Sequence, residues 1–206
     1  MSIFNVLKEL GLASNKTTSL FYKGTRDNPN IDIYRDKNSG VIFIKDYYVG
    51  EEVYLKAKYK IKDSQKKRKN NKIKDYERAN DCARRLKDFS PFYIKKDIVD
   101  FGCGEGDFLN EIKELANSLV GVELEEDCIN KLLKDDIKCE KNLTKFKDKS
   151  IDTFFLFHSF EHLPEPLKEL KEIKSKLRNK GKIIIEVPHA NDFLISTLKN
   201  KSFLEF

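Results

Sequence analysis

The sequence predicts an α/β protein with a Rossmann-like parallel sheet, preceded by a smaller N-terminal part. From residue 97 onward, β-rich apolar segments alternate with segments of helical periodicity, which implies right-handed crossovers and parallel strands. The first of these strands runs directly into three glycines that are separated by single residues. A chain of 206 residues suits one domain with an appendage. We therefore expect an appendage over 1–70 and a core over 71–206.

The appendage is expected to contain a β-hairpin followed by charged helices. Two β-rich runs, 31–34 and 41–44, flank a turn-forming Asn-Ser-Gly segment at 38–40. Residues 51–69 predict a charged helix, and residues 72–87 predict a second helix with apolar side chains at helical spacing. This hairpin and helical extension would precede the core.

Positive charge is concentrated in one segment. The net charge is +6, and much of the excess lies at 56–74, around the basic run 66–69. That run has no aromatic residue within it, so a solvated helix or linker is the favoured interpretation. An electrostatic arm for RNA is the alternative. Nucleic acid is therefore not the expected partner.

The core is expected to hold five strands and three helices. The first helix begins near Glu105 and carries an apolar face from Phe108 to Leu115, and the third helix, 167–177, ends in a turn at 179–181. The last two strands are apolar on both faces, as expected for strands that are covered on both sides. In chain order the strands are expected at 98–101, 119–123, 137–139, 151–157 and 182–187, and the middle helix at 126–134.

The glycine segment is the most informative motif. Gly102, Gly104 and Gly106 follow Asp100 in the pattern G-x-G-x-G, which differs from the G-x-G-x-x-G of dinucleotide-binding turns. Glycines at a strand end permit a tight turn and let a ligand approach the backbone. Cys103 lies within this loop, where a small filling side chain is the favoured interpretation.

Other polar residues follow the remaining strands. In open parallel sheets the ligand lies beyond the carboxyl ends of the strands. Glu123 ends the second strand, where a carboxylate can accept both ribose hydroxyls of a nucleoside. Asn142 and Leu143 follow the third strand and could supply an amide and an apolar wall for an adenine. The fourth strand runs into His158, with Glu161 and His162 shortly after it.

These motifs, in this order, resemble the class I S-adenosylmethionine-dependent methyltransferases. The H-x-x-E-H segment at 158–162 is similar to that of bacterial small-molecule and surface-polysaccharide methyltransferases. The resemblance implies the strand order 3-2-1-4-5 and S-adenosylmethionine as cofactor, with S-adenosylhomocysteine as product. It implies that the cofactor is bound by Asp100, Gly102, Cys103, Gly104, Gly106, Glu123, Leu124, Asn142, Leu143 and His158.

Methyl transfer asks mainly for alignment of donor and acceptor, because the sulfonium is already activated. An oxygen acceptor also benefits from a general base, for which His158 is the first candidate. Glu161 and His162 are second candidates, and the alternative is that they only brace the loop. A zinc peptidase is disfavoured, since His158 follows a strand and Pro164 prevents a helix that spans both histidines. We expect no metal.

The resemblance implies a small polar acceptor, such as a sugar, sugar nucleotide or phosphorylated metabolite of capsule or lipopolysaccharide biosynthesis, and the basic charge of the chain favours an anionic one. An RNA or protein methyltransferase is one alternative, and a cofactor-binding module without catalysis is another. A dehydrogenase is disfavoured by the glycine spacing.

The four cysteines are scattered and suggest neither a zinc site nor a disulfide framework. No membrane span or secretory signal is recognisable, so no membrane partner and a cytoplasmic location are expected. The family's sheet continues past its fifth strand, whereas nineteen residues follow Val187 here. We therefore expect the C-terminal strands to be missing and the apolar fifth strand to form an edge that a homodimer could cover.

Overall fold

The computed structural model describes residues 2–24, 29–45 and 71–189. The chain divides into two compact units, one formed by Met1–Val49 with Pro188–Phe206 and the other by Gly50–Val187. The helix expected over 51–69 lies outside the described residues, as does the segment after residue 189. No helix in the described part of the chain is long and apolar enough to span a membrane.

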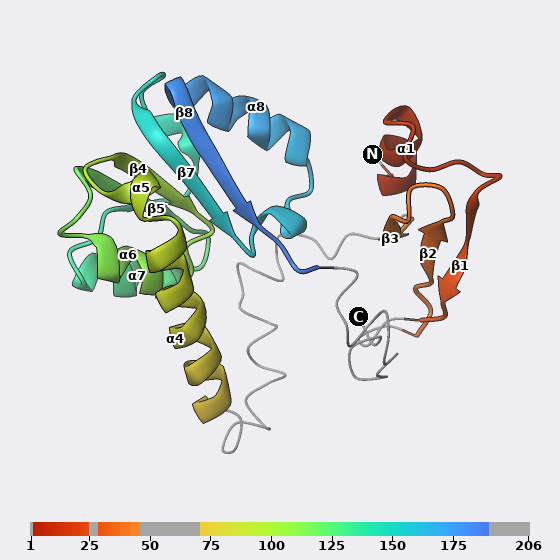
Figure 1. Cartoon of the computed structure of the whole chain (residues 1–206), viewed down its shortest axis with the longest axis horizontal. Helices are drawn as coiled ribbons and strands as arrows, with labels where there is room; N and C mark the ends of the chain where they lie inside the picture. The colour runs from red at the N-terminus through yellow and green to blue at the C-terminus, as the bar shows by residue number, and fades with distance from the viewer. Residues whose placement is uncertain (1, 25–28, 46–70, 190–206) are drawn as a thin grey trace. The chain divides into compact units, whose positions relative to one another are not determined.

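The N-terminal unit pairs one helix with a small antiparallel sheet (Figure 1). The expected hairpin is confirmed, because β2 and β3 pair antiparallel with Tyr34 opposite Phe43. The sequence analysis did not predict β1, which pairs with the other edge of β2. Phe4 from the helix stacks on Phe43, with 5.7 Å between the ring centroids. The elements are α1 (Ile3–Glu9), β1 (Thr18–Tyr22), β2 (Ile33–Asp36) and β3 (Ile42–Ile44).

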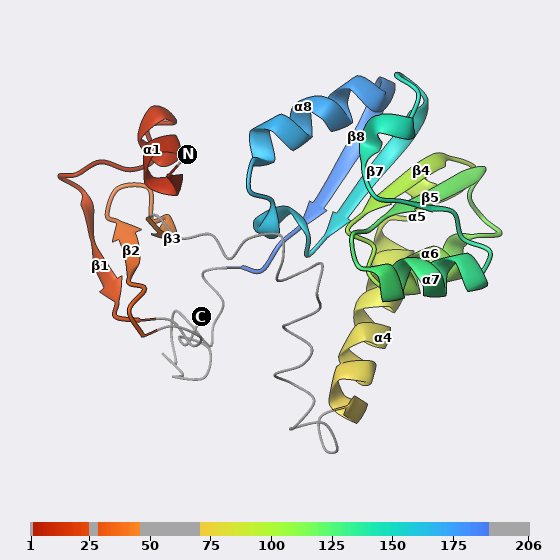
Figure 2. The same ribbon diagram turned by 180° about the vertical axis from the view of Figure 1, so that it is seen from behind.

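The larger unit is built on a parallel sheet of five strands, in the order β6-β5-β4-β7-β8 (Figure 2). Numbered along the chain, this is the expected order 3-2-1-4-5, so the Rossmann-like prediction is confirmed. All four strand pairs run parallel. The strands are β4 (Asp97–Phe101), β5 (Ser118–Val122), β6 (Cys139–Glu140), β7 (Ile151–Phe157) and β8 (Leu177–Glu186).

Helices cover both faces of this sheet. Neighbouring residues of β4 contribute to different core clusters: Ile98 packs with Phe108 and Phe155, whereas Val99 packs with Phe154 and Ile173. Side chains that alternate between two apolar layers are expected of strands buried on both faces. The α-helices are α4 (Asn71–Asp88), α5 (Ser90–Tyr93), α6 (Asp107–Ile112), α7 (Glu126–Lys134) and α8 (Pro166–Lys176). Short 3₁₀ turns cover Leu143–Lys145 and Phe160–His162.

Two element boundaries differ from the expectation. Helix α6 ends at Ile112, and Leu115 is 45% exposed rather than part of the apolar face. Its carbonyl instead accepts a hydrogen bond from the Lys95 amide at 2.8 Å, at the opposite end of β4 from the glycine loop. The residues after Ile112 therefore form the connection between α6 and β5. The apolar spacing of the sequence does not indicate where the helix ends.

The turn expected at 179–181 is instead an irregularity inside β8. Ile151 pairs with Leu177 and Thr153 with Lys182, so several extra residues of β8 bulge out between the two pairs. Lys180 has a positive φ of 69°, which is consistent with a local reversal of the strand. A bulge accommodates the residues that the sequence analysis assigned to a loop.

Strand β8 is an edge of the described sheet. Two apolar side chains near its C-terminal end, Ile185 within the strand and Val187 just after it, are 40% and 45% exposed. An exposed apolar edge can pair with another chain, and the covering of β8 by a homodimer partner stays a prediction.

Candidate functional site

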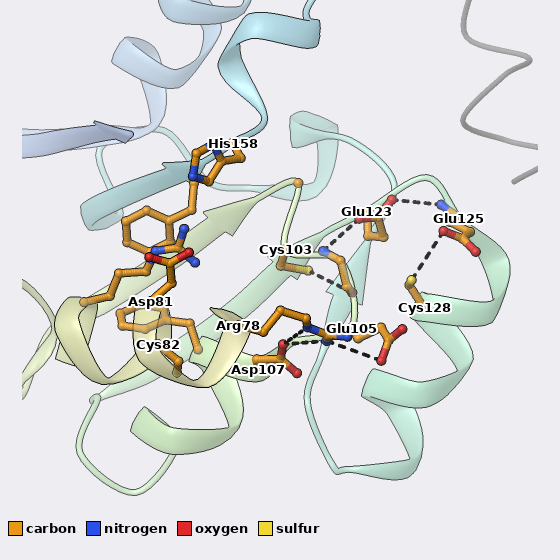
Figure 3. A pocket seen from close by; sticks show the side chains of 15 residues that line it. Arg78, Asp81, Cys82, Cys103, Glu105, Asp107, Glu123, Glu125, Cys128 and His158 are labelled. Carbon is orange, nitrogen blue, oxygen red and sulfur yellow. Dashed lines mark hydrogen bonds and ion pairs between the residues drawn. The ribbon is translucent and has the colours of Figure 1, made fainter. Parts of the chain in front are cut away.

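A cavity of about 370 Å³ lies where the carboxyl ends of β4, β5 and β7 meet α4 (Figure 3). Five residues that the sequence analysis assigned to the cofactor line it: Gly102, Cys103, Gly104, Glu123 and His158. These residues come from three strand ends that are far apart in the sequence, so the parallel order of the sheet brings them together.

Glycine is needed at each of the three positions in the loop, but for different structural reasons. All have positive φ values, 76°, 55° and 79° for Gly102, Gly104 and Gly106. A Cβ at Gly102 would lie 2.5 Å from the Ser159 Cβ, and one at Gly106 would lie 2.2 Å from Leu132, so packing excludes a side chain at both. A Cβ at Gly104 would meet nothing within 4 Å. Gly104 therefore presents open backbone to the cavity.

Glu123 is held against this loop by backbone amides. Its Oε2 accepts a hydrogen bond from the Gly104 amide at 2.9 Å. Its Oε1 accepts from the amides of Leu124 and Glu125 at 2.6 and 3.0 Å. A carboxylate has about four lone-pair positions, and three of them are used here, so about one remains to accept a hydroxyl donor from a ligand. The side chain is thus fixed in place while it faces the cavity.

Asp100 lies at the end of β4 and is 3% exposed. Its Oδ1 has no hydrogen-bond partner among the described residues. Burial raises the pKa of Asp100 from 3.8 to about 7, with Arg85 opposing the shift and Glu123 adding to it. Asp100 is not among the residues that line the cavity, but it directly precedes the loop that does so. Buried polar atoms are nearly always satisfied, so an orphaned carboxylate oxygen at this strand end suggests a ligand donor.

Helix α4 supplies a wall of the cavity that the sequence analysis missed. The Arg78 Nε donates to Asp107 at 2.8 Å, and the Arg85 guanidinium lies over the Phe157 ring, 4.4 Å from its centroid. The sequence signal that could have indicated this wall is a row of charged residues on one face of α4. Five lining residues are carboxylic acids, Asp81, Glu105, Asp107, Glu123 and Glu125, and two are arginines, Arg78 and Arg85. This excess of carboxylates suits a positively charged ligand.

His158 lies at the edge of the cavity, directly after β7 (Figure 3). Its φ of 52° is in the left-handed region, which non-glycine residues seldom adopt. Its Nε2 is 3.3 Å from Oε1 of Glu186, and its Nδ1 is 3.6 Å from Oε1 of Glu161. Glu186 ends β8 and was not singled out by the sequence analysis. The backbone amide of His158 donates to the Glu186 carbonyl at 2.9 Å, which ties the two strand ends together.

Glu161 and His162 belong to the 3₁₀ turn after β7 and do not line the cavity. The His162 Nε2 is 4.0 Å from the Glu161 carboxylate, and more than half of the His162 side chain is exposed. The Glu161 carboxylate faces the His158 ring, but neither side chain is part of the cavity lining.

The residues assigned to the adenine also lie outside the cavity lining. The Asn142 side chain accepts a hydrogen bond from the Thr144 amide at 3.0 Å and so caps a 3₁₀ turn. Leu143 is 1% exposed and packs in the core with Val99, while Leu124 is 36% exposed. Their contact with a nucleobase stays a prediction.

Cys103 packs tightly within the loop. A Cβ at Gly121 would lie 2.6 Å from the Cys103 sulfur and 3.6 Å from the Cys139 sulfur, so this glycine makes room for both thiols. Its hydrogen bond to Cys139, together with burial, raises the pKa of the Cys103 thiol. No group of three or more His, Cys, Asp or Glu side chains in the described residues could hold a metal ion.

These features fit a nucleoside that carries a positive charge. Gly104 offers backbone without a side chain, Glu123 offers an acceptor for a hydroxyl group, and the Asp100 Oδ1 offers a buried acceptor for a cationic or N–H donor. S-adenosylmethionine has all three complementary parts: a backbone-like methionine moiety, a ribose and a sulfonium with an ammonium group.

Comparisons with known proteins agree with this arrangement. Over 101 residues the chain is 31% identical to a tRNA U34 carboxymethyltransferase of Nautilia profundicola, covering 44% of this chain and 34% of that protein. A protein of the same name from Campylobacter fetus is 30% identical over 122 residues, covering 52% and 43%. The chain thus spans less than half of these two relatives.

A solved structure shares both fold and sequence features. A SAM-dependent methyltransferase from Archaeoglobus fulgidus is 30% identical, with a TM-score of 0.51 over 61% of this chain and 60% of that one. In addition, residues 74–206 match a family model described as a methyltransferase domain. That match covers more than half of the chain and includes the glycine loop and every residue that lines the cavity, so the chain belongs to the methyltransferase-domain family.

Proposed function

We propose that the protein transfers a methyl group from S-adenosylmethionine to a small polar acceptor. One observation carries this proposal: the orphaned Asp100 carboxylate lies buried beside a glycine loop to which Glu123 is bonded. Such a site would bind a cation and a ribose together, and both are parts of S-adenosylmethionine. The methyltransferase named in the Archaeoglobus fulgidus structure supports the same cofactor.

The residues of the cavity would bind and orient the cofactor. Glu123 would accept a ribose hydroxyl, and the open backbone at Gly104 would lie against the methionine moiety. Asp100 would accept from the ammonium group, which favours the ionised form of the acid. When bound, the cofactor supplies a methyl group on a sulfonium that is already activated, so alignment is the main task of the protein.

His158 would act on the acceptor rather than on the cofactor. It is the described histidine that lines the cavity, and an imidazole can take the proton that an oxygen acceptor loses. We expect His158→Asn, which tolerates a positive φ better than alanine does, to lower the transfer rate about 100-fold or more while leaving the affinity for S-adenosylhomocysteine unchanged. Radiolabelled methyl transfer and calorimetry measure the two quantities.

The chemistry of the cavity narrows the acceptor. Because carboxylates outnumber arginines along its lining, a hydroxyl group of a neutral sugar is favoured over a phosphate near the reacting centre. The similarity of the 158–162 segment to surface-polysaccharide methyltransferases supports a sugar or sugar nucleotide, whose phosphates could lie outside the cavity.

RNA is the second candidate acceptor. It is favoured by two relatives named tRNA U34 carboxymethyltransferase and by the basic segment at 56–74 of the sequence. Salt-dependent binding of tRNA together with methyl transfer to it would support this candidate over the sugar.

Calorimetry with S-adenosylmethionine, S-adenosylhomocysteine and NAD tests the cofactor. We expect the first two to bind and NAD not to bind, and the reverse result would overturn the proposal. Labelled S-adenosylmethionine is then incubated with monosaccharides, sugar nucleotides and unmodified tRNA. Transfer to a sugar supports the leading proposal, and transfer to tRNA alone replaces it. Cofactor binding without transfer to any of them would indicate a binding module.

A further inference from the structure

The Glu186 carboxylate contacts three side chains, those of Arg84, Arg85 and His158, although Glu186 belongs to none of the sequence motifs. The Arg85 Nε donates to its Oε1 at 3.0 Å, and Nη2 of Arg85 donates to the same oxygen. Nη2 of Arg84 donates to its Oε2 at 2.7 Å. The His158 Nε2 lies 3.3 Å from Oε1. The side chains of Glu186 and Arg85 are only 16% and 15% exposed, so their contact is largely shielded from water, whereas Arg84 and His158 are more exposed.

The fold fixes the relative position of Glu186 and His158. Phe157 and Glu186 are register partners in the β7–β8 pair, and the His158 amide donates to the Glu186 carbonyl at 2.9 Å. His158 then leaves the strand with a φ of 52°, a conformation that is strained for an L-residue. Strain of this kind is often retained where a side chain must be aimed.

The two nitrogens of the His158 ring face different carboxylates. Nδ1 is 3.6 Å from Glu161 Oε1, whereas Nε2 is 3.3 Å from Glu186 Oε1. The contact with Glu186 is therefore the shorter of the two and lies just beyond the usual N–H···O hydrogen-bond distance. In a neutral imidazole, the partner of one nitrogen decides which nitrogen carries the proton. The charged groups that face the ring or its partner are Glu161 from the turn after β7, Glu186 from β8, and Arg84 and Arg85 from α4.

We propose that Glu186 is the positioning residue of His158: it holds the proton on Nε2 and thereby presents the unprotonated Nδ1 to the acceptor. This inference rests on the proposed function only for the identity of the reaction. As the acceptor oxygen bonds the methyl carbon, the carbon–sulfur bond of the cofactor breaks and the acceptor proton passes to Nδ1.

Arg84 and Arg85 keep the Glu186 carboxylate ionised. Burial raises the pKa of Glu186, but the hydrogen bonds and charges of Arg85 and Arg84 outweigh it, so the pKa lies below its ordinary value. Glu186 therefore stays ionised and remains an acceptor for Nε2 over the working pH range. The same bonds join α4, which forms a wall of the cavity, to the end of β8.

Nitrogen-15 NMR of the imidazole rings of the full chain tests this inference without an acceptor. The chain has three histidines, so the spectrum is simple, and His158→Asn identifies the His158 ring. At pH 8 we expect a single neutral tautomer for His158, with the proton on Nε2 and a directly bonded Nε2–H signal. Glu186→Gln cannot accept from both arginines and from His158, so we expect this signal to be lost and the nitrogen shifts to move toward a mixture of tautomers.

Glu161→Gln is the matched control, because it removes the other carboxylate that faces the ring. We expect it to keep the wild-type tautomer. An unchanged His158 ring in both Glu186→Gln and Glu186→Ala, with a folded amide spectrum, would overturn the inference. An equal change in Glu161→Gln would also overturn it.

A kinetic readout follows once the acceptor panel yields a substrate. We expect Glu186→Gln to lower kcat about tenfold, with KM for S-adenosylmethionine unchanged, and to lower it no further in the His158→Asn background. Additive effects would contradict a role through His158. If wild type fails to bind S-adenosylhomocysteine, the proposed function fails, whereas the tautomer measurement still decides the role of Glu186.

Discussion

Two buried aspartates, one in each unit of the chain, show opposite ways of holding a carboxylate. Asp36 ends β2 and is 1% exposed, and Asp100 is the penultimate residue of β4 and is 3% exposed. Asp36 is surrounded by donors: Oδ1 accepts from the amides of Asn38 and Ser39 at 2.9 and 3.0 Å, and Oδ2 accepts from the Thr17 hydroxyl. Asp100 leaves Oδ1 without any partner among the described residues.

The pKa values follow from this difference. The hydrogen bond from Thr17, with those from Ser39 and Asn38, lowers the pKa of Asp36 from 3.8 to about 2. Burial without donors raises the pKa of Asp100 to about 7. A carboxylate whose donors come from its own fold stabilises that fold. One that is buried without donors destabilises the fold and is best explained by a ligand that supplies them.

The largest expected effect is on stability at Asp100. Its folded pKa is raised, so between pH 4 and 7 the folded protein holds a proton that the unfolded chain has released, and stability falls as pH rises through this window. Asp100→Asn lacks this loss. We expect its stability advantage over wild type to grow by about 4 kcal/mol between pH 4 and pH 8, as measured by urea unfolding.

Asp127→Asn, at an exposed position of α7, is the control and should show no such growth. If the free energy of unfolding depends on pH in the same way in wild type and in Asp100→Asn, burial does not destabilise the ionised Asp100. The contrast with Asp36 would then disappear.

Glu123 lies between the two extremes, because backbone amides satisfy it while it still faces the cavity. We expect Glu123→Ala to weaken binding of S-adenosylhomocysteine about 10- to 100-fold, since a hydrogen bond to a charged group contributes about 1.5–3 kcal/mol. Calorimetry measures this loss. The control is Glu114→Ala, which replaces an exposed acid just after the C-terminal end of α6 and should bind S-adenosylhomocysteine as wild type does. Unchanged affinity in Glu123→Ala would remove Glu123 from the site.

The smallest effect is expected at Asp36. Its folded pKa is lowered, so the stability it contributes is present above pH 4 and is lost as pH falls through about 2. Asp36→Asn keeps an oxygen for the amides of Asn38 and Ser39, and we expect a modest loss of protection of these amides at pH 6. Hydrogen exchange measures it. A larger change in stability at pH 6 in Asp36→Asn than in Asp100→Asn would contradict this order of effects.

Much of the larger unit could be predicted from sequence because its signals are local. Strand β7 is apolar at nearly every position, and the glycine loop has a spacing that only a tight strand-to-helix turn requires. Parallel strands then place Gly104, Glu123 and His158 at one sheet edge without further information.

The remainder of the site depends on tertiary pairing, which has no local signal. Glu186 appears in the sequence as one acid in an apolar strand, and Arg85 as one charge on a helix. Only packing of α4 against the end of β8 shows that they form an ion pair. The bulge in β8 was likewise hidden, because Gly181 looks like a turn residue but is required where a Cβ would lie 3.1 Å from the Asp152 carbonyl oxygen.

The most direct test of the central claim is the pH dependence of cofactor binding in wild type and in Asp100→Asn. If a cationic donor of S-adenosylmethionine satisfies Asp100, binding favours the ionised acid. The account then predicts that affinity rises as pH increases from 5 to 8, with proton release near pH 6, and that Asp100→Asn loses both effects. Affinity independent of pH in wild type, or identical in the variant, would contradict the account.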